Sequence, residues 1–419
     1  MRSEYRHNHY VPVWYQKRFL APDTHELFYL DLKPDIFTTP QGGRYSSRAL
    51  KHIGPDHCFA QHDLYTTYLG TDTPRDIEKI FFGAVDSNGR AGVEYFSSFA
   101  HPSIGHDTFN PMLLYMSTQK LRTPKGLGLI GSATGVLSRD LILNVMLQLQ
   151  NLYCAAWTEC VWQIADASQS RTKFIISDHP ITVYNRECGP RSQWCRGFND
   201  PDVWLHGTHT IFPLSLEKVL ILTNLSWARN PYQSAIETRP NPNPFRGAIF
   251  KYTEIQTLRH LAEQEVREIN FIIKSRALRY IAAAEEEWLY PDKYVSKSDW
   301  NTFGHGYLLM PDPRPINLGG TIMWGNNDGT GGAMDEYGRR PWEKDFEKEN
   351  KNSLETTTLY QFKGEFARLF GPRRRGRTFE VMRLDPEVDS DDFHQYHLSL
   401  QRKSYRERKE EAREKKAAH

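Results

Sequence analysis

The sequence predicts a mixed α/β protein, with α+β as the alternative: a mainly helical core domain with a small sheet, followed by a less ordered, basic C-terminal extension. Apolar residues recur at helical spacing in two long stretches, and short β-branched runs lie between those stretches. Gly, Pro, Asn and basic residues accumulate toward the C-terminus. We expect a core domain over residues 1–290 and an extension over residues 291–419.

Composition restricts the class of protein. Hydrophobic residues make up 39% of the 419 residues, which is enough for a sizeable core, and the formal net charge of +2 gives no general bias toward polyanions. The cysteine count is odd and no CxxC pair occurs, so we expect neither a disulfide framework nor a zinc knuckle. The polar N-terminus lacks a signal-peptide core, and polar residues interrupt the most apolar stretch, 141–164. We therefore expect a soluble protein of the cytoplasm, with the nucleus as the alternative.

The first third of the chain contains one predicted strand and two predicted helices. The alternating segment LFYLDLK, residues 27–33, predicts a strand, and the glycine- and proline-containing residues 38–57 predict a connection. Thr73 followed by proline predicts the start of a helix. A second helix is predicted over residues 109–123, ending before Pro124.

The middle of the chain alternates between helical and strand patterns. Residues 138–165 have the strongest helical periodicity, and KFIISDHP, residues 173–180, predicts a short strand that ends at Asp178. The apolar VLILT within residues 209–224 predicts a strand buried on both faces. Residues 257–290 predict one long amphipathic helix.

The C-terminal extension changes in character twice. Residues 299–345 are rich in Gly, Pro, Asn and Trp, and GPRRRGR follows at residues 371–377. The last 19 residues carry eight Lys/Arg against four Glu. These basic segments predict a phosphate contact or a nuclear import signal, whereas a solvated helix with paired charges is the alternative for the tail.

The N-terminal segment holds the first group of residues with chemical potential. His7 and His9 stand one residue apart, so on an extended chain they point to the same side. Metal ligation or general acid–base catalysis requires such a placement. The alternative is a surface segment whose histidines are merely polar.

A second group lies at the end of the helix predicted over residues 109–123. Gln119 and Arg122 are three residues apart and share a helical face, which offers a carboxylate or phosphate a guanidinium and an amide. Alternatively, Arg122 only complements the helix dipole.

A third group follows the strand predicted at residues 173–180. Asp178 places a carboxylate where a buried strand emerges, a common position for catalytic or metal-binding groups in α/β proteins. Turn formation by Ser177 and Asp178 before Pro180 is the alternative. His179 is less informative and carries no separate prediction.

Several separated blocks resemble one family when taken together. They are HYVPVWYQKRF at 9–19, QKLRTP at 119–124, FIISDHP at 174–180, FPLS at 212–215 and VREIN at 266–270. In this order they resemble the domain-of-unknown-function family 4238, found in bacteria and fungi, over roughly residues 7–285. The resemblance implies no activity. It implies that His9, Gln119, Arg122 and Asp178 belong to recurring blocks, which favours one joint site.

Walker, GxSxG and HExxH motifs are absent from the sequence, and no GxGxxG follows a predicted strand, so function must be argued from these groups. The leading hypothesis is an enzyme that acts on a phosphate-containing substrate, a nuclease or phosphodiesterase. His9 and Asp178 would serve as acid–base groups or as ligands of a divalent metal, and Arg122 with Gln119 would hold the phosphate. The alternatives are a non-catalytic module that binds an anionic ligand or nucleic acid, and a partner-binding scaffold.

Overall fold

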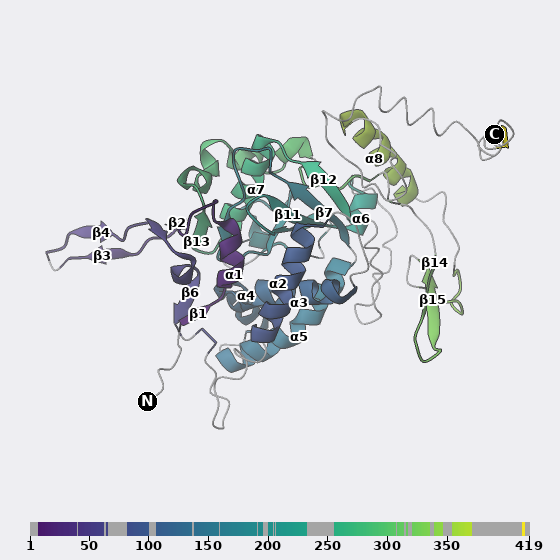
Figure 1. The fold of residues 1–419 in the computed structure, drawn as a ribbon, viewed down its shortest axis with the longest axis horizontal. Helices are drawn as coiled ribbons and strands as arrows, with labels where there is room; N and C mark the ends of the chain where they lie inside the picture. The colour runs from purple at the N-terminus through teal and green to yellow at the C-terminus, as the bar shows by residue number, and fades with distance from the viewer. Residues whose placement is uncertain are drawn as a thin grey trace.

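The computed structural model shows a mixed α/β body from which a narrow hairpin projects at one end (Figure 1). It describes residues 7–65, 82–99, 106–232, 255–370 and 413–414, apart from residues 40, 63, 136–137, 159, 191, 196–199, 204, 206, 307, 314–315, 317–320, 336–338 and 347–353. This confirms the predicted mixture of helices and sheets. Among the described residues, every helix is too short or too polar to cross a membrane.

A five-stranded sheet forms the centre of the body, in the order β12-β7-β11-β10-β9. Its strands are β7 (Cys160–Asp166), β9 (Thr182–Asn185), β10 (Thr208–Pro213), β11 (Lys218–Asn224) and β12 (Gln256–His260). All pairs are antiparallel except β12 with β7. The middle of β11 is buried throughout, which confirms the strand predicted from VLILT.

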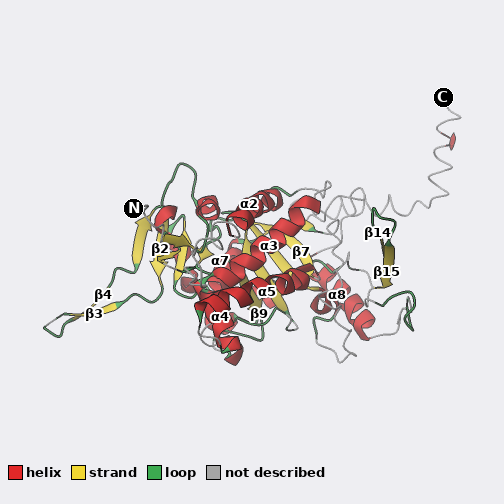
Figure 2. Ribbon diagram, turned by 90° about the horizontal axis from the view of Figure 1, so that it is seen from below, coloured by secondary structure: helices red, strands yellow, loops and turns green. Residues whose placement is uncertain are grey.

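Four helices form a group beside this sheet, in which α4 packs on α3 and α5: α2 (Gly83–Ser97), α3 (His106–Arg122), α4 (Pro124–Thr134) and α5 (Arg139–Thr158). Figure 2 shows α3 and α5 lying side by side across the strands. Aromatic rings fill the interface, because Trp162 of β7 meets Phe96 of α2 and Phe109 of α3 at centroid distances of 5.5 and 5.6 Å. α3 confirms the helix predicted to end before Pro124. The predicted start at Thr73 lies outside the described residues.

A four-stranded sheet has the order β5-β2-β13-β8. It consists of β2 (Leu27–Asp31), β5 (Leu50–Ile53), β8 (Ile176–Ser177) and β13 (Tyr280–Ala283), all antiparallel. β2 confirms the strand predicted from LFYLDLK. A separate strand pair, β1 (His7–His9) with β6 (Ala60–His62), and the short helix α1 (Val13–Gln16) lie beside it.

Two predicted helices are too long. The helix predicted over residues 138–165 ends at Thr158, and Cys160–Asp166 form β7, because all seven of these residues pair with β11 in the sheet. The helix predicted over residues 257–290 is helical only in α7 (Glu263–Arg276). On either side of it, β12 pairs with β7 and β13 pairs with β2.

The connection predicted at residues 38–57 is also more regular than expected. β3 (Ile36–Thr38) and β4 (Arg44–Ser46) form the hairpin that projects from the body, and β5 follows it (Figure 1).

Residues beyond 290 pack against the body as well as extending from it. Trp300, Phe303 and Leu309 lie in the main hydrophobic core, and Tyr184 Oη donates to the Trp300 carbonyl at 2.6 Å. α8 (Leu354–Phe370) packs on α6 (Leu225–Arg229), and β14 (Thr321–Gly325) pairs with β15 (Gly331–Asp335). The division at residue 290 stays a prediction, and the basic segment at 371–377 lies outside the described residues.

We predict that Gly126→Ala destabilises the protein because α4 begins in close contact with the end of α3. A Cβ atom at Gly126 would overlap the backbone carbonyls of Lys120 and Leu121, neither of which is the end of a flexible side chain. We expect the free energy of unfolding, measured by urea denaturation, to fall by about 1–3 kcal/mol. Gly364→Ala is the control, since no atom lies within 4 Å of its Cβ position on α8. Equal effects of the two substitutions would contradict the prediction.

Candidate functional site

His9 lies at the end of β1, where its neighbour Ala60 belongs to β6. Its Nε2 atom donates to the backbone carbonyl of Asp56 at 3.0 Å. The preceding residue, Asn8, is buried and accepts the Leu64 N–H at 2.9 Å. This segment is therefore attached to the chain around residues 56–64 by both strand pairing and side-chain hydrogen bonds.

Gln119 and Arg122 lie in the last turn of α3 and bind each other. The Arg122 Nε atom donates to Gln119 Oε1 at 2.9 Å, and the guanidinium pairs with Asp86 of α2 at 2.8 Å. Gln119 Nε2 donates to the Tyr10 carbonyl at 2.7 Å. Arg122 is only 1% exposed. The pair predicted from helical spacing therefore exists, and it connects α3 to α2 and to the N-terminal segment.

Asp178 follows β8 directly and is fully enclosed by backbone donors. Its oxygens accept the N–H groups of Leu278, Arg279 and Tyr280 at 2.9, 2.6 and 2.9 Å. Burial raises the pKa of the carboxyl above its usual range, and the three N–H donors oppose that rise. The side chain thus fixes the residues that lead from α7 into β13.

A cluster of charged side chains lies between these groups. We call Lys120, Lys125, His179 and Asp200 the buried ion cluster. Lys120 Nζ and His179 Nε2 each lie 3.0 Å from Asp200 Oδ2, and Lys125 Nζ pairs with Asp200 Oδ1. Each of the four side chains is at most 6% exposed.

Thr123 links this cluster to the start of α4. As N-cap it accepts the Gly126 N–H at 3.1 Å, and its Oγ1 lies 2.7 Å from His179 Nδ1. Lys125 also donates to the Arg276 carbonyl at 2.7 Å, at the end of α7. The α3–α4 junction, the end of β8 and the end of α7 therefore converge on one carboxylate.

Electrostatics assign the protonation states in the cluster. Burial, followed by repulsion from Lys120, lowers the pKa of His179 to about 3, so its imidazole is neutral. Lys125 and Lys120 hold the pKa of Asp200 well below its usual range, despite the opposing effect of burial. A neutral His179 that donates from Nε2 to Asp200 accepts at Nδ1 from the Thr123 hydroxyl.

The structure brings together the two segments that carry Gln119, Arg122 and Asp178. The contacts between these segments are made by adjacent residues that were not among the predicted site residues. Gln119 and Arg122 adjoin Lys120 and Thr123, and Asp178 adjoins His179. His9 faces Asp56 instead. Asp200 had no recognisable sequence signal, whereas the lysines of the QKLRTPK segment, two of them within six residues around a helix N-cap, could have indicated an anion site.

Metal ligation was predicted for His9 and Asp178. In the part of the chain that the structure describes, no three His, Cys, Asp or Glu side chains are grouped so that they could hold a metal ion. The joint site of His9, Gln119, Arg122 and Asp178 and its metal stay predictions.

Comparison with known proteins identifies one matching family model. Residues 137–287 match the family model described as "Protein of unknown function (DUF4238)". The match confirms the family resemblance from residue 137 onward, whereas the resemblance expected over residues 7–136 stays a prediction. The matched region contains Asp178, His179 and Asp200. Gln119, Lys120 and Arg122 precede it. No curated protein and no solved structure matches the chain.

We predict that stability decreases as pH falls below about 6.5, because buried histidines resist protonation. Burial lowers the pKa of both His179 and His209 to about 3. The unfolded chain takes up these protons near pH 6.5 and the folded chain only near pH 3, so acid favours unfolding between these values. Each histidine contributes up to about 1.4 kcal/mol per pH unit. Urea denaturation at pH 6.5, 6.0, 5.5 and 5.0 measures the slope.

The variant His209→Asn tests the assignment. His209 Nδ1 lies 2.9 Å from Thr223 Oγ1, a contact that the Asn amide can retain. We expect the slope of the unfolding free energy against pH to decrease by the contribution of one histidine. An unchanged slope would contradict the prediction.

We also predict that Asp178→Asn destabilises the fold. An amide cannot accept all three N–H groups, so at least one buried donor loses its partner, at a cost of about 1–3 kcal/mol. Asp35→Asn is the control, because the Asp35 side chain is 61% exposed. Differential scanning calorimetry checks both, and an Asp178→Asn protein as stable as the control would refute the structural role.

Proposed function

We propose that this protein is a non-catalytic module that binds a small phosphate-containing ligand at the buried ion cluster, in place of the Asp200 carboxylate. The observation that carries the proposal is the contact of two lysines with this carboxylate. Lys120 and Lys125 place two amino groups against the single carboxylate of Asp200, and burial lowers the pKa of Lys125 although Asp200 opposes that shift. A phosphate monoester carries about −1.5 to −2 at pH 7 and would balance two ammonium groups more closely.

The start of α4 supports an anion at this place. A helix N-terminus carries partial positive charge, which acidic side chains usually offset. The first turn of α4 has no acidic residue and contains Lys125 instead. An anion from elsewhere is therefore needed beside it, and Asp200 currently provides one.

The position of Asp200 in the chain favours exchange. The carboxylate belongs to the connection between β9 and β10 and not to either strand. Its removal from the cluster would leave the sheet pairing intact. The donors come from the α3–α4 junction and from the end of β8, which the hydrogen bonds of Thr123 and Asp178 hold in place.

Binding fits these groups better than hydrolysis does. A general base should have a pKa near the working pH, and the pKa of His179 is about 3. The Asp178 oxygens accept three backbone N–H groups. We therefore favour the binding module over the nuclease or phosphodiesterase, and the test includes turnover.

The test is isothermal titration of the full-length protein with inorganic phosphate at pH 7 in a chloride buffer of constant ionic strength. Asp200→Asn removes the internal competitor, and we expect it to bind phosphate at least tenfold more tightly than the unsubstituted protein. Lys125→Met leaves Lys120 paired with Asp200, and we expect it to lose binding. Lys218→Met, which removes a lysine paired with Asp166, is the matched control.

Three results would reject the proposal. The first is that neither the unsubstituted protein nor Asp200→Asn releases heat on titration with phosphate. The second is that Asp200→Asn binds phosphate and the unsubstituted protein does not. The third is that Lys125→Met binds phosphate as tightly as the unsubstituted protein. Binding by Asp200→Asn alone would show that Asp200 is a permanent occupant. Release of p-nitrophenol from bis(p-nitrophenyl) phosphate, lost in Lys125→Met, would replace the binding module by a hydrolase.

A further inference from the structure

The hairpin of β3 and β4 is a projecting arm, which we define as residues 36–46. Figures 1 and 2 both show it extending away from the body. All six residues of its two strands are exposed. The arm therefore contributes little to the core, and its side chains are available to a partner.

Two aromatic rings occupy one face of the arm. Phe37 and Tyr45 are directly opposite each other in the strand register, and their rings stack with centroids 5.4 Å apart. They are 46% and 56% exposed, and Ile36, which precedes Phe37 in β3 and so lies on the opposite face, is 71% exposed. Exposed apolar groups gathered in one place mark interaction sites more often than scattered ones do.

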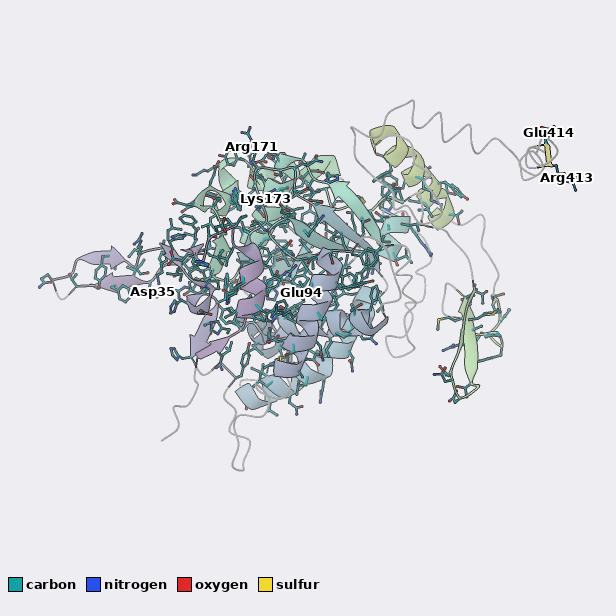
Figure 3. All side chains as sticks on the ribbon, viewed as in Figure 1. Asp35, Glu94, Arg171, Lys173, Arg413 and Glu414 are labelled. Carbon is teal, nitrogen blue, oxygen red and sulfur yellow. The ribbon has the colours of Figure 1, made fainter. Side chains whose placement is uncertain are left out.

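The arm has a fixed shape although it lacks a core of its own. At its tip Thr39 N–H donates to the Gly43 carbonyl at 2.7 Å, and at its base Ser47 N–H donates to the Asp35 carbonyl at 2.8 Å. The guanidinium of Arg279 pairs with Asp31 and Asp35, each at 2.8 Å. Figure 3 labels Asp35 where the arm meets the body. A surface held in advance loses little conformational entropy when it binds.

Basic residues lie on the arm and directly after it, whereas Asp35 directly precedes it. Residues 36–51 contain no Asp or Glu and three basic residues, Arg44, Arg48 and Lys51. All three are exposed. The acidic groups at the base, Asp31 and Asp35, are paired with Arg279.

We propose that the arm binds single-stranded nucleic acid. Bases would stack on Phe37 and Tyr45, and phosphates would contact Arg44 of the arm together with Arg48 and Lys51, which follow the arm in the chain. Stacking rings combined with a basic track are the features that proteins use to bind single strands without sequence preference. Paired bases in a duplex offer no free ring face to Phe37 and Tyr45, so a single strand fits better than a duplex. This site is separate from the buried ion cluster and does not rest on the binding proposed there.

The test is fluorescence anisotropy with a fluorescein-labelled dT12 oligonucleotide and the full-length protein. The double substitution Phe37→Ala/Tyr45→Ala should weaken binding about tenfold or more, since each stacked base contributes about 1–3 kcal/mol. It should leave the salt dependence unchanged. The triple substitution Arg44→Ala/Arg48→Ala/Lys51→Ala should reduce the slope of log K against log salt by about 2, at about 0.7 per lost phosphate contact.

Tyr360→Ala is the matched control, because Tyr360 is a 68% exposed aromatic residue on α8. The substituted side chains are exposed, so the melting temperature should not change and folding can be checked directly. Absence of dT12 binding, or binding that survives both sets of substitutions, would overturn the proposal and leave the arm to a protein partner. Equal affinity for a 12-base-pair duplex would also overturn it.

Discussion

The enclosure of charge at the junction of α3 and α4 is the constraint on which the body of this protein depends. Removing one partner of a buried ion pair typically costs about 3–5 kcal/mol, so Lys120 and Lys125 can be buried only where an anion reaches them. Asp200 meets this requirement from a connection far along the chain. The β9–β10 connection, the end of β8 and the end of α7 are therefore positioned by electrostatics as well as by packing.

Other buried polar groups near the α3–α4 junction bind further segments of the chain. Gln119 and Arg122 bind the N-terminal segment and α2, and Asp178 binds the backbone that enters β13. Each of these contacts joins segments more than 30 residues apart. The polar residues of the sequence blocks thus serve as crosslinks between elements, and their hydrogen-bonding capacity is directed at the protein itself. The proposed anion site lies instead at the cluster around Asp200, where two lysines meet one carboxylate.

Elements that depend on local sequence patterns were predicted correctly, whereas those that depend on contacts between distant segments were not. β2, α3 and β11 were predictable because alternation, helix stops and a short apolar run are local features. β7 was missed because Cys160–Asp166 continues the apolar periodicity of α5, and only pairing with β11 makes it a strand. The same limit applies to Asp178 and Asp200. The sequence shows a carboxylate at the end of a strand, but it does not show which groups will bind it. Asp178 binds the backbone of residues 278–280, and Asp200 binds two lysines that are distant in the chain.

The contrast between the cluster and the arm indicates which surfaces can meet a partner. Polar residues attract attention in a sequence, yet here Arg122, Asp178 and His179 are buried and bound to their neighbours. The arm drew only the prediction of a connection, although it exposes Phe37 and Tyr45 among basic residues. Exposing a stacked aromatic pair forgoes the hydrophobic stabilisation that burial would provide, although the contact of Phe37 with Tyr45 also supports the pairing of β3 with β4. Hydrogen bonds of Asp35, Thr39 and Gly43 hold the arm in shape, so about half of each ring surface is presented to solvent in a fixed place.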